Sequence, residues 1–224
     1  MSAPTQAFAD RLSSWSAEGR LPEMRPAQQS RSARTAAALI EAGRHLLREK
    51  SLEDLSIELV CDSARTTVGA FYGRFESKQD FFVTMQRVQT MQTEQSIQAF
   101  VERHPAGASS IDALCADIVH ETINNFRTNF GVMRASLQHS REGMWQVIKE
   151  SGDRYRAMLV QLLAPYLKHL KPRERERRIL FAYQALAGVL VHIVLNNPGP
   201  LRLDDAAIED ELLRLVRSYL SAAE

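Results

Sequence analysis

The stretch TTVGAFYGRFESK, Thr66 to Lys78, gathers side chains that can bind anions. Two adjacent threonines open it, and Tyr72, Arg74 and Lys78 follow toward its other end. Hydroxyl groups offer single hydrogen bonds, while guanidinium and ammonium groups add positive charge, and all of these suit phosphate oxygens. These residue types favour contact with a nucleic acid, and the alternative is a plain helical corner whose cations are solvated.

Two short helices are expected to position these groups. Ser56 can cap a helix whose apolar positions are residues 57, 60, 61 and 64. Residues 65–67 interrupt this pattern, and residues 68–75 form a second short helix. Phe71 and Phe75 lie four residues apart on one face of it. The spacing therefore predicts two helices joined by a tight turn.

Longer helices are expected on both sides of this pair. Residues 31–47 carry the apolar stripe of an amphipathic helix. Ser77 and Asp80 resemble a capping box, which would start a long helix that runs to about Arg103. The segment from Arg25 to Lys50 contains six basic residues and two acidic ones, whereas the whole chain has a net charge of only +1. The positive charge that a polyanion requires is thus local.

Three helices in this order are typical of a helix-turn-helix unit. Its second short helix enters the major groove with its N-terminal residues at the base edges. The small residues Val68, Gly69 and Ala70 would allow close approach to thymine methyl groups. Phe71 and Phe75 would point the other way, so that aromatic and cationic side chains share the segment on opposite faces.

The segment SIELVCDSARTTVGAFYGRFESKQDFF resembles the helix-turn-helix and following helix of TetR-type transcriptional regulators. The resemblance covers about residues 31–82. It implies an all-α fold of about nine helices, with an N-terminal three-helix DNA-binding domain and a C-terminal helical domain for ligand binding and dimerisation. The residues assigned to DNA contact are Ser56, Arg65, Thr66, Thr67, Val68, Gly69, Ala70, Tyr72, Arg74 and Lys78.

The turn departs from the family pattern at one position. Ala64, Arg65 and Thr66 stand where the family usually has Ala-Gly-Val, so an arginine is expected to adopt a positive φ. Either the turn geometry differs, or the chain accepts a strain of about 1 kcal/mol there, which a phosphate contact by Arg65 would offset. The alternative function that this residue suggests is a helical ligand- or protein-binding module that no longer binds DNA.

Three domains are expected along the chain. Residues 1–29 contain three prolines and form an N-terminal arm with a short helix near Phe8 to Trp15. Arg25, Arg31 and Arg34 could reach a minor groove, although a solvated tail explains them as well. Residues 30–77 form the DNA-binding domain, and residues 78–224 form the effector-binding and dimerisation domain.

The last two helices, at about 174–196 and 205–222, are expected to form a homodimer contact. The apolar run from Ile179 to Leu195 is too extensive for one exposed face, although burial within one subunit would also explain it. The resemblance further implies an effector pocket between the middle helices. A small, apolar or aromatic effector is expected, and the candidate lining residues are Phe126, Phe130, Met133, Trp145 and Tyr183.

Other classes of function find little support in the sequence. No phosphate-binding loop, nucleophile elbow or zinc-protease motif occurs, and the six histidines lie far apart. An enzyme, a metal and a cofactor are therefore not expected. The apolar run is at the short limit for a membrane span and contains Gln184 and His192, so no membrane segment is expected.

A dimeric, cytoplasmic regulator that binds double-stranded operator DNA is the function that the sequence favours. The chain starts without the pattern of a secretory signal, and its two cysteines cannot form a disulfide framework, which fits a reducing cytoplasm. A repressor that a small molecule releases from its operator is the expected form. The operator, the effector and the direction of control are not encoded in any motif.

Overall fold

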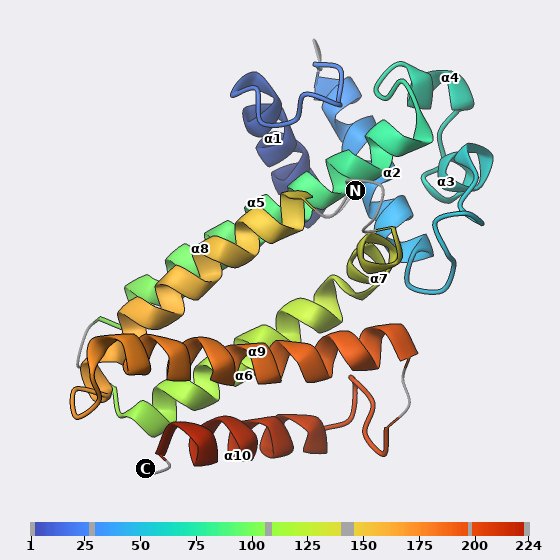
Figure 1. Cartoon of the computed structure of the whole chain (residues 1–224). Coiled ribbons are helices and arrows are strands. Elements are labelled where there is room, and N and C mark those ends of the chain that lie inside the picture. Colours follow the sequence, from blue (N-terminus) through green and yellow to red (C-terminus); the bar gives the residue numbers. More distant parts are fainter. Residues whose placement is uncertain (1–2, 27–29, 106–108, 140–145, 197–198, 222–224) are drawn as a thin grey trace. The chain divides into compact units, whose positions relative to one another are not determined.

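The computed structural model describes residues 3–26, 30–105, 109–139, 146–196 and 199–221. Within these ranges it contains ten α-helices, a short 3₁₀ helix and no strand (Figure 1). The predicted all-α fold is confirmed. The chain divides into two compact units, of which the first comprises residues 1–91 with 131–147 and the second residues 92–130 with 148–224.

The first unit contains the predicted three-helix motif. Its helices are α2 (Ser30–Leu46), α3 (Ile57–Ser63) and α4 (Val68–Tyr72). The α4 helix ends three residues before the predicted Phe75, because the chain turns at Gly73 and Arg74. The long α5 (Lys78–Arg103) begins and ends where the capping pattern predicts. Its first fourteen residues belong to this unit.

The predicted N-terminal arm contains a 15-residue helix, α1 (Ala3–Ala17), which packs against α2. Its residues Phe8, Leu12 and Trp15 are all buried in the core of the first unit. Hydrophobic residues at these spacings line one helical face, which explains why this segment adds to the core.

Two glycines allow helices of the first unit to approach closely. A Cβ atom on Gly43 of α2 would lie 2.7 Å from the Phe81 ring of α5. One on Gly131 would lie 2.4 Å from the carbonyl carbon of Leu47, where α7 (Phe130–Gln138) meets the end of α2. Backbone atoms cannot move aside as a flexible side chain can, so Gly131 is a steric requirement of this contact.

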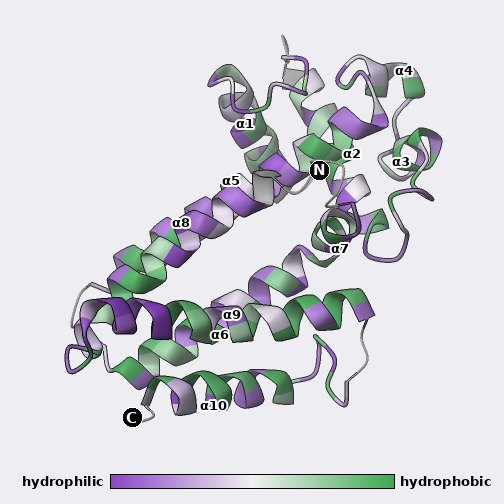
Figure 2. Ribbon diagram, in the orientation of Figure 1, coloured by the Kyte–Doolittle hydropathy of each residue, from purple (hydrophilic) through white to green (hydrophobic). Residues whose placement is uncertain are grey.

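The second unit is built on α6 (Ile111–Thr128), α9 (Pro172–Asn196) and α10 (Ala207–Ser221), which contact one another. The α8 helix (Gln146–Leu163) and the 3₁₀ helix η2 (Ala164–Tyr166) precede α9. Buried apolar residues follow helical spacing on each of the three main helices. The α9 helix is hydrophilic at its N-terminal end and hydrophobic over most of its remaining length (Figure 2).

The α9 helix is also the one helix, among those described, that is long and apolar enough to cross a membrane. It packs against α6 and α10, and its buried residues include Ile179, Leu186 and Leu190. A core helix of a globular domain can have the same composition, so the length and composition of α9 are weak evidence for a membrane span.

Candidate nucleic-acid interface

The leading end of α4 combines a side-chain cap with an exposed surface. Thr67 is the N-cap, and its Oγ1 accepts a hydrogen bond from the Ala70 backbone N–H at 3.1 Å. Val68 is 37% exposed and Tyr72 is 47% exposed. Gly69 is exposed as well, and a Cβ atom added to it would meet only the Thr67 hydroxyl, at 3.9 Å. The predicted reading surface is therefore open to a partner.

The opposite face of α4 is anchored by aromatic rings. Phe71, Phe75 and Phe81 are completely buried. The ring centroids of Phe71 and Phe75 are 5.3 Å apart, and those of Phe75 and Phe81 are 5.0 Å apart. Such ring pairs each add roughly 0.5–1.5 kcal/mol beyond the burial of their area. The predicted division of this segment into an inner aromatic face and an outer polar face is confirmed for these rings.

The predicted positive φ at Arg65 is confirmed, with a value of 51°. The Thr66 N–H donates to the Cys61 carbonyl at 2.9 Å, and the Arg65 N–H donates to the Asp62 carbonyl at 3.1 Å. This pair of bonds is the Schellman motif, in which glycine is favoured at the position that Arg65 occupies. The turn thus keeps its usual geometry despite the arginine.

A second helix end in the same unit shows the usual solution. Gly19 follows α1 with a φ of 71° and repeats the pair of bonds, with Gly19 N–H donating to Ser16 and Arg20 N–H donating to Trp15. Glycine has no Cβ and adopts this conformation freely, whereas an arginine is strained by about 1 kcal/mol. The geometry of the turn does not require an arginine, so a contact made outside the turn would explain its presence.

Ser56 and the two predicted cations have structural partners in the first unit. The Ser56 hydroxyl caps α3 by accepting from the Leu59 N–H at 3.1 Å, as predicted. The Arg74 guanidinium donates to the Arg25 and Pro26 carbonyls, both at 2.9 Å. The Lys78 ammonium donates to the Leu52 carbonyl at 3.0 Å. DNA contact by Arg74 and Lys78 therefore remains a prediction, because each already satisfies backbone carbonyls.

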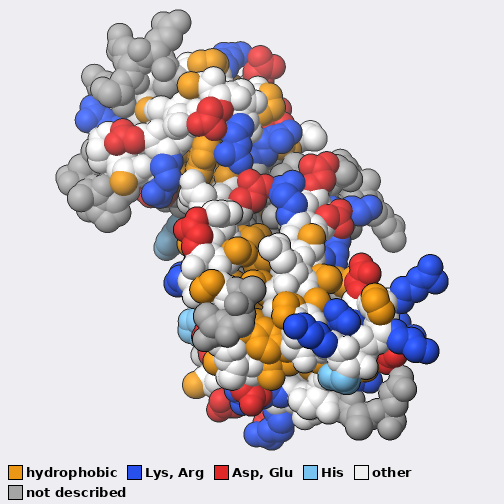
Figure 3. Space-filling view, turned by 90° about the vertical axis from the view of Figure 1, so that its left-hand side faces the viewer, with side chains coloured by type: hydrophobic (Ala, Val, Ile, Leu, Met, Phe, Trp, Pro, Cys, Tyr) orange, Lys and Arg blue, Asp and Glu red, His pale blue; other side chains and the backbone are white. Residues whose placement is uncertain are grey.

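Charge is mixed rather than concentrated over much of the face that Figure 3 shows. On the face shown in Figure 3, Lys and Arg side chains alternate with Asp and Glu. Burial lowers the pKa of Arg44 on α2 and that of Arg74 from their usual values. Any attraction for DNA depends on local groups such as Arg65, which is exposed.

The predicted effector residues are divided between the two units. Phe126 on α6, Phe130 at the start of α7 and Tyr183 on α9 belong to the second unit, and Met133 belongs to the first. Phe126 and Met133 are buried. Trp145 lies outside the described residues. The predicted set is not a single cluster within one unit.

Two residues that the sequence did not single out join Tyr183. The Tyr155 ring of α8 lies 5.1 Å from the Tyr183 ring, and its hydroxyl lies 3.0 Å from the Thr122 hydroxyl of α6. Burial raises the pKa of both tyrosines, to about 12 for Tyr183. Their phenols therefore stay protonated at neutral pH and can donate hydrogen bonds. The four-residue spacing on α6 could have predicted that Thr122 and Phe126 share a helix face. No spacing in the sequence predicts the contact of Tyr155 with Tyr183, which lie on different helices.

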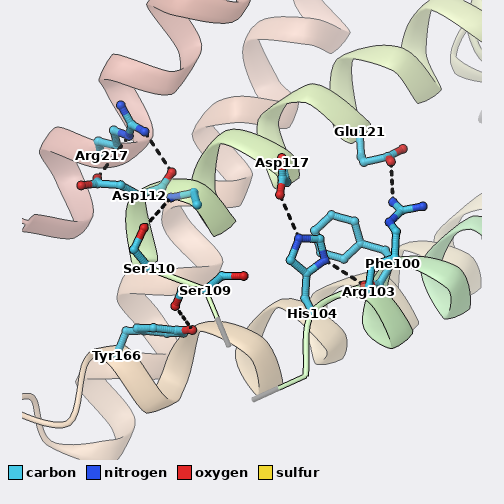
Figure 4. A network of polar contacts seen from close by, with 11 residues as sticks. Phe100, Arg103, His104, Ser109, Ser110, Asp112, Asp117, Glu121, Tyr166 and Arg217 are labelled. Carbon is cyan, nitrogen blue, oxygen red and sulfur yellow. Dashed lines mark hydrogen bonds and ion pairs between the residues drawn. The ribbon is translucent and has the colours of Figure 1, made fainter. Parts of the chain in front are cut away.

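A network of polar contacts connects the end of α5 with α6 in the second unit (Figure 4). His104, after α5, stacks on Phe100 at 4.2 Å and lies 2.8 Å from an Asp117 carboxylate oxygen of α6. Arg103 pairs with Glu121 at 2.8 Å. These exposed pairs order the α5 and α6 junction but contribute little stability individually. Among the described residues no group of three or more His, Cys, Asp or Glu side chains could hold a metal ion.

Comparison with known proteins now identifies the class that this geometry indicates. Residues 39–85 match the model "Bacterial regulatory proteins, tetR family", which spans the end of α2, all of α3 and α4 and the start of α5. Residues 110–220 match the model "Tetracyclin repressor-like, C-terminal domain". The protein is a helix-turn-helix regulator, and the chain belongs to the TetR family. A comparison with curated protein sequences finds no match.

Solved structures with this fold come from several bacteria. A protein from Mesorhizobium loti, assigned to the TetR family of transcriptional regulators, superposes with a TM-score of 0.70 at 13% identity, covering 86% of this chain and 98% of its own. A TetR-like transcriptional regulator from Rhodococcus gives 0.63 at 14% identity, with 85% and 98% covered. A protein from Pseudomonas aeruginosa assigned as a transcriptional regulator gives 0.61 at 18% identity, with 83% and 88% covered. At these identities the likeness concerns the fold.

The family and the fold make this chain a DNA-binding transcriptional regulator. Members of this family are generally not enzymes, and their domains bind DNA and dimerise. The predicted class is confirmed at this level.

Proposed function

We propose that this protein is a homodimeric repressor that binds operator DNA through the leading end of α4 and is released by a small effector. Two copies are needed because a helix of five residues reads too few base pairs for a specific site. The observation that carries the proposal is that α4 has two different faces. One face is exposed, and the other carries fully buried aromatic rings that anchor the helix while its contact groups stay open to DNA.

The proposed DNA contacts follow the exposed side of α4 and its turn. Thr66, Val68 and Gly69 approach the base edges, and Tyr72 and Arg65 bind phosphates. The Tyr72 phenol is carried on a ring that contacts Phe71 edge-on at 5.6 Å, so that its position is constrained before DNA arrives. A phosphate contact by Arg65 would offset the strain of its backbone and explain why glycine is not used there.

An operator-binding experiment tests this proposal. DNA flanking the gene of this protein is titrated in a gel-shift assay at several salt concentrations, with the wild type and with Tyr72→Ala and Tyr72→Phe. A specific, salt-sensitive complex is expected, weakened at least about tenfold by Tyr72→Ala. Tyr72→Phe keeps the ring, so the affinity that this variant loses reports the hydroxyl contact alone. No specific complex at low salt would support the alternative of a module that does not bind DNA.

The direction of control has its own test. If the protein is a repressor, deletion of its gene raises transcription of the adjacent gene, and a copy carrying Tyr72→Ala fails to restore repression. A fall in transcription after deletion would instead identify an activator.

The proposed dimer contact is the exposed apolar face of α9 and α10. Phe181 is 50% exposed and Tyr219 is 37% exposed, and their ring centroids lie 5.3 Å apart. Val189, Leu195 and Leu215 are exposed large apolar residues on the same two helices. Two aromatic rings and three aliphatic side chains in water are costly for a monomer, and a second copy would bury them.

Gly188 marks the proposed crossing point of the two α9 helices. It lies inside α9 and is exposed, and a Cβ there would meet no atom of the described residues within 4 Å. A glycine inside a helix costs about 1 kcal/mol relative to alanine, so nothing within the chain accounts for it. A partner helix that approaches the backbone closely would account for it, as small residues allow at helix crossings.

Substitution of Gly188 tests the dimer. Gly188→Leu is expected to leave the helical circular dichroism of the protein unchanged, because the side chain projects into open space in the single chain. Sedimentation velocity is expected to show a monomer for Gly188→Leu and a dimer for the wild type. A Gly188→Leu protein that remains dimeric would place the contact elsewhere.

The effector is proposed to be a small apolar or aromatic molecule held in the second unit near Phe126 and Tyr183. The support is the cluster of Tyr183, Tyr155 and Thr122, whose rings and hydroxyls could stack on and hydrogen-bond an aromatic compound. Thermal-shift screening of aromatic compounds should find stabilising ligands whose effect is reduced in Tyr183→Ala. Ligands that act equally on both proteins would place the effector elsewhere.

A further inference from the structure

Residues 18–26, between α1 and α2, lie outside both family models and belong to the first unit. Leu21 and Met24 in this segment are buried in the core of that unit. The segment is therefore held in place by its apolar residues, and its polar residues are positioned for defined contacts.

Arg25 and Arg74 form a reciprocal set of hydrogen bonds at the C-terminal end of α4. The Arg25 backbone N–H donates to the Arg74 carbonyl at 2.8 Å, and its Nη1 donates to the Tyr72 carbonyl at 2.9 Å. The Arg25 Nη2 lies 3.1 Å from a Glu76 carboxylate oxygen. In return, Arg74 Nη1 donates to the carbonyls of Arg25 and Pro26.

These bonds satisfy groups that a five-residue helix leaves open. The last four carbonyls of any helix have no hydrogen-bond partner within that helix. Because α4 has only five residues, most of its carbonyls are in this position. A charged guanidinium on the Tyr72 carbonyl is stronger than a neutral donor would be and also favours the negative end of the helix dipole. The end of α4 that carries Tyr72 is thus fixed by residues almost fifty positions earlier in the chain.

A second ion pair anchors the segment to α5. Arg87 Nε donates to the two carboxylate oxygens of Glu23 at 3.0 and 2.8 Å, and Nη2 donates to Oε1 at 2.9 Å. The Glu23 side chain is only 19% exposed, and such two-pronged Arg pairs restrict both side chains. Glu23 therefore holds the segment two residues before Arg25.

We propose that residues 18–26 act as a strap that holds the C-terminal end of α4, with Arg25 as a positioning residue for DNA recognition. The proposal rests on the proposed DNA-binding function. Arg25 acts through the α4 backbone and not through phosphate. The strap replaces part of the support that a longer recognition helix would supply by itself, because it orders the turn from Tyr72 to Glu76 before DNA binds.

The salt dependence of operator binding separates positioning from direct contact. Wild type, Arg25→Ala and Arg25→Lys are titrated on the DNA flanking the gene at several salt concentrations, with Arg11→Ala on the exposed side of α1 as the matched control. Arg25→Ala is expected to weaken specific binding about tenfold with an unchanged slope of log K against log salt. A slope reduced by about one would show a lost phosphate contact and overturn the proposal.

Hydrogen exchange tests the strap without DNA. In Arg25→Ala the backbone amides of residues 72–76 are expected to exchange at least about tenfold faster, while those of α2 and α3 keep wild-type rates. Arg25→Lys is expected to give an intermediate rate, since lysine can reach one carbonyl but cannot serve two acceptors as a fork. Unchanged exchange at residues 72–76 would overturn the strap.

The anchor has a charge-reversal test. Arg87→Glu should raise exchange at residues 72–76 as Arg25→Ala does, and the Glu23→Arg, Arg87→Glu double variant should restore it. Failure of the double variant to restore protection, with both proteins folded, would contradict the role of Glu23. If wild type binds no DNA while exchange behaves as expected, the strap stands and the proposed function fails.

Discussion

One aromatic cluster in each unit shows a different exposure to solvent. In the first, Phe71, Phe75 and Phe81 are fully buried against one another. In the second, Phe181 and Tyr219 contact each other but remain 50% and 37% exposed. The first unit completes its core within one chain, whereas the second leaves an apolar face that one chain does not cover. The proposed dimer would cover this face with a second copy of the chain.

The first unit uses its exposed surface for polar contacts. Around α4 it leaves exposed the Tyr72 phenol, Val68 and the strained Arg65, and the polar groups among them suit a hydrated, charged partner. What the second leaves open is apolar, which suits a surface like itself. The proposed function thus assigns one surface of the chain to DNA and a different one to a second copy.

The largest expected effect comes from the closed core. Phe75→Ala removes a ring that contacts both Phe71 and Phe81, and it should lower the free energy of unfolding of the first unit by about 3–5 kcal/mol. Urea denaturation followed by circular dichroism measures this. A loss below about 1 kcal/mol would mean that the core tolerates the cavity and that the buried ring cluster contributes little to the stability of the first unit.

The open face should respond differently to the same kind of change. Phe181→Ala should leave the unfolding of dilute, monomeric protein nearly unchanged but weaken dimerisation about tenfold or more. Phe181→Leu, which remains apolar, is the matched control. Equilibrium sedimentation gives the dimer dissociation constant, and an unaltered constant in Phe181→Ala would exclude this face from the interface.

A smaller effect, of opposite sign, is expected at Arg65. Arg65→Gly removes the strain of a positive φ and should raise the free energy of unfolding by about 1 kcal/mol. The same variant should bind the operator more weakly, since a phosphate contact is lost. Gly19→Arg at the end of α1 is the mirror control and should destabilise by a similar amount. Operator binding that is unchanged or stronger in Arg65→Gly would contradict the phosphate contact.

The smallest effect concerns pH. Burial raises the pKa of Tyr183 from 10.0 to about 12, so the stability gained by keeping its phenol neutral is complete below pH 10 and is lost as the pH rises toward 12. Tyr183→Phe cannot ionise and should show a shallower fall in unfolding free energy over this range. Equal slopes in both proteins would indicate that the phenol is hydrated.

The local parts of the fold could be predicted because their signals are local. The caps at Ser56 and Ser77, the aromatic spacing of Phe71 and Phe75, and the arginine at the glycine position each depend on neighbours within a few residues. These features place α3, the start of α4 and the start of α5 correctly, although α4 ends at Tyr72 and not at Phe75, and they fix which face of α4 is buried.

Features that depend on distant partners could not be predicted. Arg74 was expected to face phosphate, but its guanidinium bonds carbonyls at Arg25 and Pro26, 49 and 48 positions away. The role of residues 8–24 in the core is likewise a tertiary effect, although the spacing of Phe8, Leu12 and Trp15 shows one apolar face. The Tyr155 and Tyr183 contact brings together two helices whose pairing no local pattern encodes.

The stoichiometry of the DNA complex tests the central claim most directly. Analytical ultracentrifugation of the protein with a labelled duplex from the region flanking its gene should show two chains per duplex for the wild type. Gly188→Leu should form no such complex at the same concentration, although its helices are intact. A stable specific complex with one chain per duplex, or full binding by Gly188→Leu, would contradict the account of a dimer that reads DNA through paired α4 helices.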